Sequence, residues 1–445
     1  MIVSVVGCGY LGAVHAAAMA SLGHTVVGVD VDEAKVAALA SGRAPFFEPG
    51  LEDLLAQVCG QGALRFTTDL RDAAGAAVHF VCVGTPQAKD SRQADLTHVD
   101  AAMASLLELA RATGAATTVV GKSTVPVGTA ARWAEAFDRA GAGVTLVWNP
   151  EFLREGFAVK DTLHPDRIVY GLPPGERGRR AAATLDDVYG ELLRQGVPKI
   201  ETDYATAELV KVAANSFLAT KISFINAMAE VADAAGADVL DLALAIGLDP
   251  RIGSRFLRPG IGFGGGCLPK DIRAFLARAE ELGAADALRF LAEVDEVNLR
   301  ARRRLVDLVA RCVTDDPAGD LPGARVAVLG AAFKPDSDDI RDSPALDIAA
   351  ALAGRGATVL VYDPAAGEKA KGTPGVAVVA STEAAVTGAD VVVVATEWQE
   401  FRDLDPAAIR PLVRRAVVAD GRLCLDATAW RAAGWTYVAP GRPGL

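Results

Sequence analysis

The sequence predicts an α/β fold with two doubly wound domains joined by a long central helix. Three observations predict it: short apolar runs alternate with amphipathic segments near the start, a helical stretch with few strand signals follows, and the strand and helix rhythm then returns. This rhythm is typical of Rossmann-like domains with parallel sheets. The 445 residues suit about three domains, which we place at 1–200, 201–311 and 322–445.

Short apolar runs define the predicted strands of the two outer domains. They are interpreted as buried parallel strands because both faces of each run are apolar and helical segments separate them. In the first domain the predicted strands are 2–6, 25–29, 78–83, 117–120 and 144–148, and in the last they are 325–329, 358–362, 390–395 and 423–425.

The stretch 202–311 has a different character, with Ala, Leu, Val and Glu at helical spacing. It is predicted to contain one very long helix from about Tyr204 through Ala235. Residues 315–319, Asp-Asp-Pro-Ala-Gly, form a linker by composition. The middle of the chain is therefore predicted to be a helical connector.

The bulk composition limits the classes of partner and cofactor. A formal charge of -11 disfavours non-specific binding to nucleic acid, although a local basic cleft for a phosphorylated ligand is compatible with it. Cysteines occur without a C-x-x-C pair and histidines without metal-ligand spacing, so we expect neither disulfides nor a metal site. The start runs directly into a predicted strand, and no apolar run reaches the roughly 20 residues of a membrane span. We expect an unexported, cytoplasmic protein that does not enter a membrane.

A glycine pattern follows the first predicted strand. Gly7, Gly9 and Gly12 permit a tight turn, close approach to a pyrophosphate and close helix packing. Asp30 ends the next strand, where a carboxylate binds a ribose diol and repels a 2′-phosphate, which favours NAD over NADP. The alternative is a tight turn followed by a solvated acid. The predicted cofactor contacts here are Gly7, Gly9, Tyr10, Leu11, Gly12 and Asp30.

A cysteine lies on a second glycine-rich loop, 262–271. Cys267 follows four glycines within six residues, and Asp271 indicates a helix that starts beside the thiol. Exposed backbone N–H groups and a helix start both favour a thiolate. The alternative is a buried small apolar residue. With a nicotinamide cofactor, such a thiol traps an aldehyde and permits a second oxidation, so the pair suggests a four-electron, alcohol-to-acid dehydrogenase.

Further polar residues are candidates for proton transfer. Lys211 and Asn215 are spaced i,i+4 on one face of the long predicted helix, although a lysine among apolar neighbours also extends its amine to water. Glu151 and Glu155 follow the strand 144–148, at the carboxyl edge where such sheets bind ligands. The alternative is a solvated helix start with acids that complement its dipole.

Two turns at predicted strand ends carry hydroxyl groups. Thr85 lies in the turn 83–86, and Thr124 lies in the turn 122–126. These hydroxyls face either a cofactor or water, and threonine and proline are also ordinary turn formers.

The chain resembles the UDP-glucose/GDP-mannose dehydrogenase family in ordered motifs that run nearly from end to end. These motifs are residues 7–12, 48–51, 83–86, 123–126, 149–155, 164–168, 262–271, 333–341 and 420–422. The resemblance implies an N-terminal NAD domain, a helical dimer core and a C-terminal domain that grips a UDP-sugar. It also implies NAD-dependent oxidation of UDP-glucose to UDP-glucuronate for polysaccharide biosynthesis.

The resemblance implies a role for each residue that matches a family motif. Cys267 is the nucleophile, Lys211 and Asp271 are acid/base residues or hold the reacting water, and Asn215 assists them. Glu151 is implicated in thioester hydrolysis, and Thr124 lies near that chemistry. The implied cofactor contacts are Lys35, Thr85, Thr124, Glu155, Lys270 and Arg341. The implied substrate contacts are Glu151, Phe152, Leu153, Glu155, Lys211, Asn215, Phe263, Gly264, Phe333, Lys334 and Arg422, together with Arg251, which in relatives reaches the substrate of the partner subunit and implies a homodimer or higher homo-oligomer.

Other functions remain open at this point. GDP-mannose is the runner-up substrate, a UDP-N-acetylmannosamine substrate is disfavoured by the residues after Cys267, and a β-hydroxyacid dehydrogenase would leave the cysteine loop unexplained. The non-enzymatic alternative is an NAD-binding scaffold. The chain departs from the family pattern at Gly266, Ala331, Phe157 and Lys160, and Gly266 could alter the stiffness of the cysteine loop.

Overall fold

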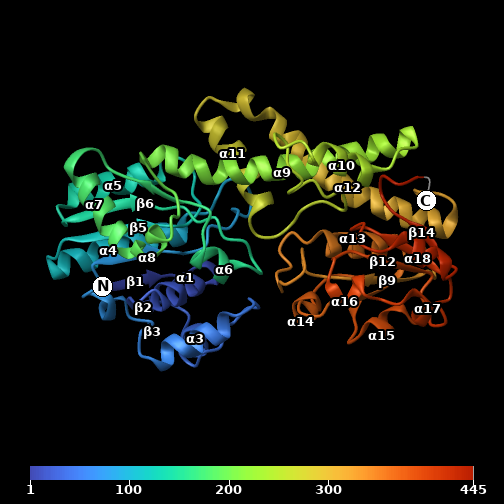
Figure 1. Cartoon of the computed structure of the whole chain (residues 1–445), viewed down its shortest axis with the longest axis horizontal. Helices are drawn as coiled ribbons and strands as arrows, with labels where there is room; N and C mark the ends of the chain where they lie inside the picture. The colour runs from blue at the N-terminus through green and yellow to red at the C-terminus, as the bar shows by residue number, and fades with distance from the viewer. Residues whose placement is uncertain (444–445) are drawn as a thin grey trace. The chain divides into compact units, whose positions relative to one another are not determined.

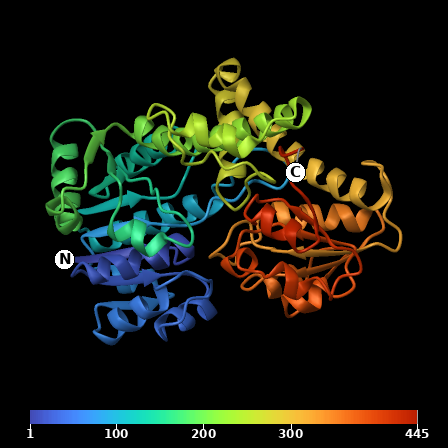
Figure 2. The same ribbon diagram turned by 45° about the vertical axis from the view of Figure 1, so that its right-hand side comes forward.

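The computed structural model describes residues 1–443, which form two compact units (Figure 1, Figure 2). The first unit comprises Met1–Ala214 with Arg273–Gly283, and the second comprises Asn215–Ile272 with the chain from Ala284 onward. The divisions fall inside helix α9 (Tyr204–Ala235) and helix α11 (Leu268–Glu281). Each unit is built on its own sheet.

The described part of the first unit contains one eight-stranded sheet in the order β3-β2-β1-β4-β5-β6-β7-β8. All neighbours are parallel except β6 and β7, which pair antiparallel at Trp148 and Gly171. The strands are β1 (Ile2–Val6), β2 (Thr25–Val29), β3 (Leu64–Thr67), β4 (Val78–Val81), β5 (Thr117–Gly121), β6 (Val144–Trp148), β7 (Ile168–Gly171) and β8 (Lys199–Thr202).

Helices cover both faces of this sheet, because neighbouring strand residues point to opposite sides. Val120 packs with α1 and α7 in one apolar core, whereas Val119 packs with α4 and α5 in another. The helices are α1 (Tyr10–Ser21), α2 (Glu33–Ala40), α3 (Leu51–Gly60), α4 (Thr97–Thr113), α5 (Thr129–Ala140), α6 (Ala158–Leu163), α7 (Gly175–Val188) and α8 (Gly190–Arg194), with a 3₁₀ turn η1 (Leu70–Ala73).

The second unit, within the described residues, contains a six-stranded parallel sheet in the order β11-β10-β9-β12-β13-β14. One face packs against α12 and α13 and the other against α9, α10 and α18. The strands are β9 (Arg325–Leu329), β10 (Thr358–Tyr362), β11 (Val376–Val378), β12 (Val391–Val394), β13 (Val417–Asp420) and β14 (Thr436–Val438). The helices are α10 (Val239–Gly247), η2 (Ala285–Leu288), α12 (Arg289–Thr314), α13 (Pro344–Gly354), α14 (Gly367–Ala370), α15 (Thr382–Val386), α16 (Gln399–Arg402), α17 (Pro406–Ile409) and α18 (Ala427–Ala432).

Most predicted elements are confirmed, including the long helix, which spans the predicted residues. The predicted strand at 423–425 is wrong: the strand is β13, and Leu423 has a φ of 50°, a left-handed conformation that a strand does not contain. The prediction missed the edge strands β3, β8, β11 and β14, and β7 as well. Among the described helices, none combines the length and apolar character needed to cross a membrane.

Candidate functional site

The division of the chain places the predicted site residues in two sets, one in each unit. The first unit holds Gly7, Gly9, Tyr10, Leu11, Gly12, Asp30, Lys35, Thr85, Thr124, Glu151, Phe152, Leu153, Glu155 and Lys211. The second unit holds Asn215, Arg251, Phe263, Gly264, Cys267, Lys270, Asp271, Phe333, Lys334, Arg341 and Arg422.

The glycine turn of the first unit forms a cradle at the start of α1. Gly7 has a φ of +89°, and a Cβ on Gly12 would lie 1.8 Å from the Gly7 carbonyl oxygen, so both positions need glycine. A Cβ on Gly9 would meet no atom of the described chain within 4 Å. Gly9 caps α1 without a side-chain hydrogen bond. This open helix N-terminus is suited to a pyrophosphate.

Asp30 lies beside this cradle at the end of β2. Its Oδ2 accepts the backbone N–H of Cys8 at 2.7 Å and the Lys35 ammonium at 3.0 Å. The carboxylate is thereby fixed at the strand end, where it can bind a ribose diol. The residues present fit NAD: Gly9 would face the pyrophosphate, and Asp30 with Lys35 would hold the ribose.

Tyr10 and Glu48 form hydrogen bonds beside the glycine turn 7–12. The Tyr10 hydroxyl donates to the Glu48 carboxylate, which is buried and also accepts the N–H groups of Gly156 and Ala158 at 2.7 Å each. Glu48 therefore caps α6 and joins the start of α1 to the segment that follows Glu155. Sequence reasoning matched Glu48 to a motif but gave it no role.

Hydroxyl hydrogen bonds connect the loops after β4 and β5. Thr85 Oγ1 donates to the carbonyl of Thr124 at 2.8 Å, and Ser123 Oγ donates to the carbonyl of Val83 at 2.7 Å. The two predicted hydroxyl-bearing turns are thus one hydrogen-bonded structure.

Glu151 and Lys211 form a nearly buried ion pair in the first unit. Lys211 Nζ donates to Glu151 Oε1 at 2.8 Å, and the Leu153 N–H donates to Oε2 at 2.7 Å. Lys211 Nζ also lies 5.7 Å from the ring centroid of Phe152. The lysine is therefore directed at the Glu151 segment, and the pair can hold or move a proton.

Cys267 lies at the start of α11 in the second unit. Its side chain is exposed, and its carbonyl accepts the N–H of Asp271 at 3.0 Å, the first turn of the helix. A helix N-terminus favours a thiolate. By contrast, Cys82 in the first unit is buried, and burial raises the pKa of its thiol to about 12. Cys267 thus differs from Cys82 in being exposed and in lying at a helix start.

Polar side chains next to Cys267 form a compact cluster. Asn215 Nδ2 donates to Asp271 Oδ2 at 2.6 Å, and the Lys270 ammonium pairs with Asp271 Oδ1. Asp271 and Asn215 are both buried. Because the amide and the ammonium fix each carboxylate oxygen, Asp271 can orient a water molecule or an oxygen of a bound substrate.

The glycine loop before Cys267 is supported by residues that sequence reasoning missed. Fully buried Asn298 on α12 accepts the Phe263 N–H at 2.7 Å and donates to its carbonyl at 3.0 Å. Arg302, one turn on, donates to the same carbonyl at 2.8 Å. A Cβ on Gly262 would lie 2.3 Å from Asn298 Oδ1, so glycine is required there. Polar residues on the buried face of a predicted helix were the available signal.

Gly266 and Gly264 have identifiable neighbours in this loop. A Cβ on Gly266 would lie 2.2 Å from the Arg341 guanidinium carbon, and one on Gly264 would lie 2.1 Å from the Asp342 carbonyl. The departure from the family pattern at Gly266 therefore leaves room for an arginine beside Cys267. Arg341 is held by Asp339, with Nη2 at 2.7 Å from Oδ2.

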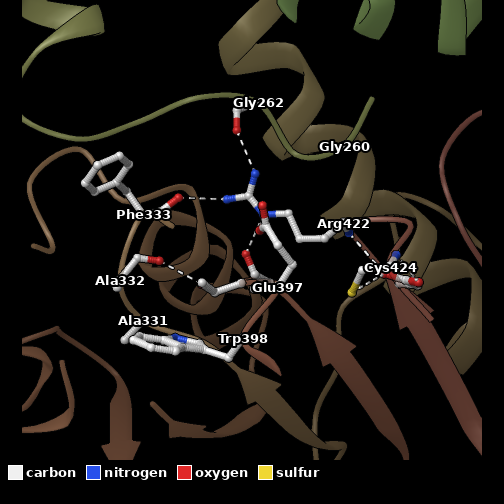
Figure 3. Close-up of polar contacts among 12 residues, drawn as sticks. Gly260, Gly262, Ala331, Ala332, Phe333, Glu397, Trp398, Arg422 and Cys424 are labelled. Atoms are coloured by element: carbon white, nitrogen blue, oxygen red, sulfur yellow. Dashed lines mark hydrogen bonds and ion pairs between the residues drawn. The ribbon is translucent and has the colours of Figure 1, made fainter. Parts of the chain in front are cut away.

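Arg422 joins three backbone segments of the second unit (Figure 3). Its guanidinium donates to the carbonyls of Gly262 at 3.0 Å, Phe333 at 3.1 Å and Ala395 at 2.8 Å. Glu397 lies 3.4 Å from Nε, and burial lowers the pKa of Arg422. Arg422 thus links the cysteine loop to the turn that follows β9.

The remaining predicted substrate residues of the second unit lie nearer the surface. Lys334 Nζ lies 5.3 Å from the ring centroid of Phe333. Arg251 is 86% exposed and pairs with Asp249.

Family models and known proteins match the chain along its length. Models of the UDP-glucose/GDP-mannose dehydrogenase family match residues 1–193 (NAD binding domain), 205–300 (central domain) and 327–427 (UDP binding domain). The chain is 41% identical to the UDP-glucose 6-dehydrogenase of Rhizobium meliloti, with 100% of both chains covered. It is 38% identical to the UDP-glucose 6-dehydrogenase TuaD of Bacillus subtilis, covering 100% of this chain and 94% of that one.

A solved structure also matches. A UDP-glucose dehydrogenase from the archaeon Pyrobaculum islandicum superposes with a TM-score of 0.88 at 40% identity, covering 98% of this chain and 96% of that one. The predicted fold and the predicted family resemblance are both confirmed. The chain belongs to the UDP-glucose/GDP-mannose dehydrogenase family.

Proposed function

We propose that this protein oxidises UDP-glucose to UDP-glucuronate in two successive NAD-dependent steps. The observation that carries this proposal is Cys267, an exposed thiol at the N-terminus of α11 beside the Asn215–Asp271–Lys270 cluster. A plain alcohol dehydrogenase has no use for such a thiol, whereas an alcohol-to-acid enzyme needs it to hold the aldehyde. The relatives named UDP-glucose 6-dehydrogenase support the substrate.

In the first oxidation, the C6 hydroxyl of the sugar loses a proton and C6 loses a hydride. Bound NAD supplies the hydride acceptor in each of the two oxidations. We assign the proton to the pair of Lys211 and Glu151, which are already joined at 2.8 Å. Lysine hydrogen-bonds the substrate oxygen, and the carboxylate keeps the proton within the pair.

In the second oxidation, the Cys267 thiolate adds to the aldehyde carbon and forms a C–S bond. The carbonyl oxygen takes up a proton and becomes the hydroxyl of a thiohemiacetal, which Asn215 and Asp271 orient. Loss of that proton and of a hydride from the same carbon gives a thioester. Water activated by Glu151 then attacks the thioester, the C–S bond breaks, and the sulfur leaves as a thiolate.

The other matched residues bind the two ligands in this proposal. Lys35, Thr85, Thr124, Glu155, Lys270 and Arg341 contact NAD, in addition to the glycine turn and Asp30. Phe152, Leu153, Phe263, Gly264, Phe333, Lys334 and Arg422 contact the sugar nucleotide. The functional domains are 1–200, 201–311 and 322–445, and the enzyme acts in the cytoplasm, where its cysteines stay reduced.

The Cys267→Ser variant tests the mechanism. Wild type should form two NADH for each UDP-glucose, with UDP-glucuronate as the product by mass. Cys267→Ser should lose steady-state turnover by at least about a thousandfold. Cys312→Ser, at a half-buried cysteine, is the matched control and should remain active. One NADH per sugar with release of aldehyde, or normal turnover of Cys267→Ser, would overturn the covalent route; NAD binding without turnover would favour a scaffold.

The choice of sugar nucleotide is testable on the same protein. GDP-mannose is the second candidate, because the GDP-mannose dehydrogenase of "Psuedomonas aeruginosa" has the same family resemblance at 29% identity and a TM-score of 0.53. Both values are lower than those for the Pyrobaculum UDP-glucose enzyme. We expect kcat/KM to be largest for UDP-glucose in a panel with GDP-mannose and UDP-N-acetylmannosamine. A higher value for another sugar would replace UDP-glucose as the substrate.

We also propose a homodimer. On the second-unit part of α9, Phe217, Phe224 and Val231 are at least half exposed and recur every seventh residue, which forms one apolar stripe. Such a stripe is typical of a helix that packs against another copy. The double variant Phe217→Asp/Phe224→Asp should be monomeric by light scattering, whereas Leu282→Asp, at an exposed leucine of the first unit, should match wild type. A monomeric wild type would exclude the dimer.

A further inference from the structure

One buried cation of the first unit has no part in the mechanism above. Lys122 lies at the end of β5, and its side chain is 7% exposed. Its Nζ donates to Asn149 Oδ1 at 2.9 Å and lies 3.4 Å from both the Asn149 carbonyl and the Tyr189 hydroxyl. The same Nζ lies 5.9 Å from the ring centroids of Phe80 and Tyr189.

These contacts only partly offset the burial of an ammonium group. They come from neutral oxygens and ring faces, and burial lowers the pKa of Lys122 to about 8. The charged and titratable groups around it are Cys82 and Glu151, which follow β4 and β6 and raise this pKa, Lys211 on α9, which lowers it, and His15 on α1. An apolar side chain of the same length would avoid this cost. A cation retained here therefore calls for a functional explanation.

Lys122 lies where two functional segments begin. It opens the loop 122–128, which carries Thr124, and its ammonium binds Asn149, which opens the segment 149–155, which carries Glu151. Asn149 makes two further hydrogen bonds. Its Nδ2 donates to the Val169 carbonyl at 2.8 Å, and its Oδ1, which also accepts Lys122 Nζ, accepts the Tyr189 hydroxyl at 2.6 Å. The ammonium therefore joins the β5 and β6 loops at their roots.

We propose that Lys122 is a positioning residue that holds the Glu151 segment in register with the Thr124 loop and adds positive potential at the Glu151–Lys211 pair. This role rests on the proposed function, because it acts through Glu151 in thioester hydrolysis. A shift of the Glu151 segment by about 1 Å is enough to cost roughly a hundredfold in rate. The step that suffers is the last one, in which water releases the acid from Cys267.

Lys122→Met is the main test, because it removes the charge and the hydrogen bonds while keeping most of the volume. Lys371→Met, at an exposed lysine of the second unit, is the matched control. We expect kcat of Lys122→Met to fall by roughly tenfold to a hundredfold, with KM for NAD and for UDP-glucose within about twofold of wild type. Intact-protein mass during turnover should show the thioester on Cys267 as the main species, and the pH profile of kcat should shift. A purely structural role would move neither the thioester level nor the pH profile.

Tyr189→Phe is the second variant and guards against misfolding of Lys122→Met. It removes one hydroxyl contact, keeps the ammonium, and should raise the thioester level to a smaller extent. Unchanged kcat, thioester level and pH profile in whichever of these variants folds would overturn the role of Lys122. If wild type itself forms no NADH and no adduct from UDP-glucose, the proposed function fails instead, and the two failures are thereby distinguished.

Discussion

In both units a glycine with a positive φ follows the first strand, Gly7 in one and Gly330 in the other, but the aspartates beside the two turns bond them differently. In the first unit, Asp30 accepts the Cys8 N–H at 2.7 Å, and the N-terminus of α1 at Gly9 remains uncapped by a side chain. In the second unit, Asp363 at the end of β10 accepts the N–H groups of both Ala331 and Ala332, at 2.7 and 2.9 Å. The carboxylate of the second unit thus bonds two backbone N–H groups of its turn, whereas Asp30 bonds one.

Strand order alone therefore does not specify a dinucleotide site. Both sheets place their first two strands side by side and end the second with an aspartate. In the second unit, that aspartate also accepts the Trp398 indole N–H at 3.1 Å, so it holds a side chain of the apolar core in place. Two alanines where the first unit has Cys8 and Gly9 accompany this change. Asp363 therefore fixes its turn to the protein at more points than Asp30 fixes the turn of the first unit.

Of the substitutions that distinguish the two turns, Gly12→Ala should have the largest effect, and it should act on NAD affinity. The new Cβ would lie 1.8 Å from the Gly7 carbonyl oxygen, so the turn has to open. We expect NAD affinity to fall by about a hundredfold or more, as for other overpacked sites, and binding of UDP by the second unit to persist. Fluorescence titration of NAD and calorimetry of UDP measure the two. Gly60→Ala, where a Cβ meets nothing, is the control; equal loss of both ligands would show general unfolding instead.

Asp363→Asn should act on stability. The amide cannot accept from Ala331 and Ala332 while also serving the N–H groups of Ala365 and Ala366. We expect the free energy of unfolding of the second unit to fall by about 3 kcal/mol, with KM for NAD unchanged. Urea unfolding followed by tryptophan fluorescence measures it, with the exposed Asp403→Asn as the control. A changed KM for NAD with normal stability would reverse the roles assigned to the two turns.

Asp30→Asn should change cofactor preference by a smaller factor. Removing the negative charge weakens binding of the ribose diol and no longer repels a 2′-phosphate, and Lys35 stays in place to attract one. We expect the ratio of kcat/KM for NAD over NADP to fall by roughly tenfold. Steady-state kinetics with both cofactors measure the ratio, and Asp363→Asn is the matched control in the other unit. An unchanged ratio would show that Asp30 does not bind the ribose.

The weakest effect should be the pH dependence that Glu208 gives to the stability of the first unit. Glu208 on α9 accepts the N–H groups of Gly128 and Ala130 at 2.7 Å each, and burial raises the pKa of its carboxyl from 4.5 to about 7. The folded state then binds more protons than the unfolded state between these values, so stability falls as the pH rises from 4.5 to 7.

Glu208→Gln removes this group from the titration. Its melting temperature should depend less on pH across that window than that of wild type, whereas Glu33→Gln, at an exposed acid of α2, should follow wild type. Parallel pH curves for Glu208→Gln and wild type would contradict the assigned pKa shift.

The sequence predicted most of the inner strands because apolar residues on both faces mark them, although β7 and β13 were missed. The edge strand β8 was missed because none of its four residues is buried and its two middle residues are exposed, as in a loop. Residues 423–425 misled for the opposite reason: Leu423 and Leu425 are apolar and buried, yet Leu423 is left-handed. Burial and strand conformation are separate properties. Apolar side chains indicate burial, but they do not determine whether the backbone is extended.

The residues of the candidate site also differ in how far the sequence could predict them. Cys267, Lys211 and Glu151 stand in short motifs, so the sequence alone could single them out as candidates. Asn298 and Glu208 bond backbone groups that are distant along the chain, so the sequence of their helices gives no hint of the partner. Arg422 was identified, but not its three carbonyl partners.

The exposure of Cys267 has a practical consequence. The remaining cysteines are buried or half-buried, and burial raises the pKa of each of these thiols: Cys8, Cys59, Cys82, Cys312 and Cys424. A mild alkylating reagent should consequently mark one position per chain and count the competent molecules in a preparation. Peroxide should silence the same position reversibly, since a sulfenic acid is returned to the thiol by a reducing agent.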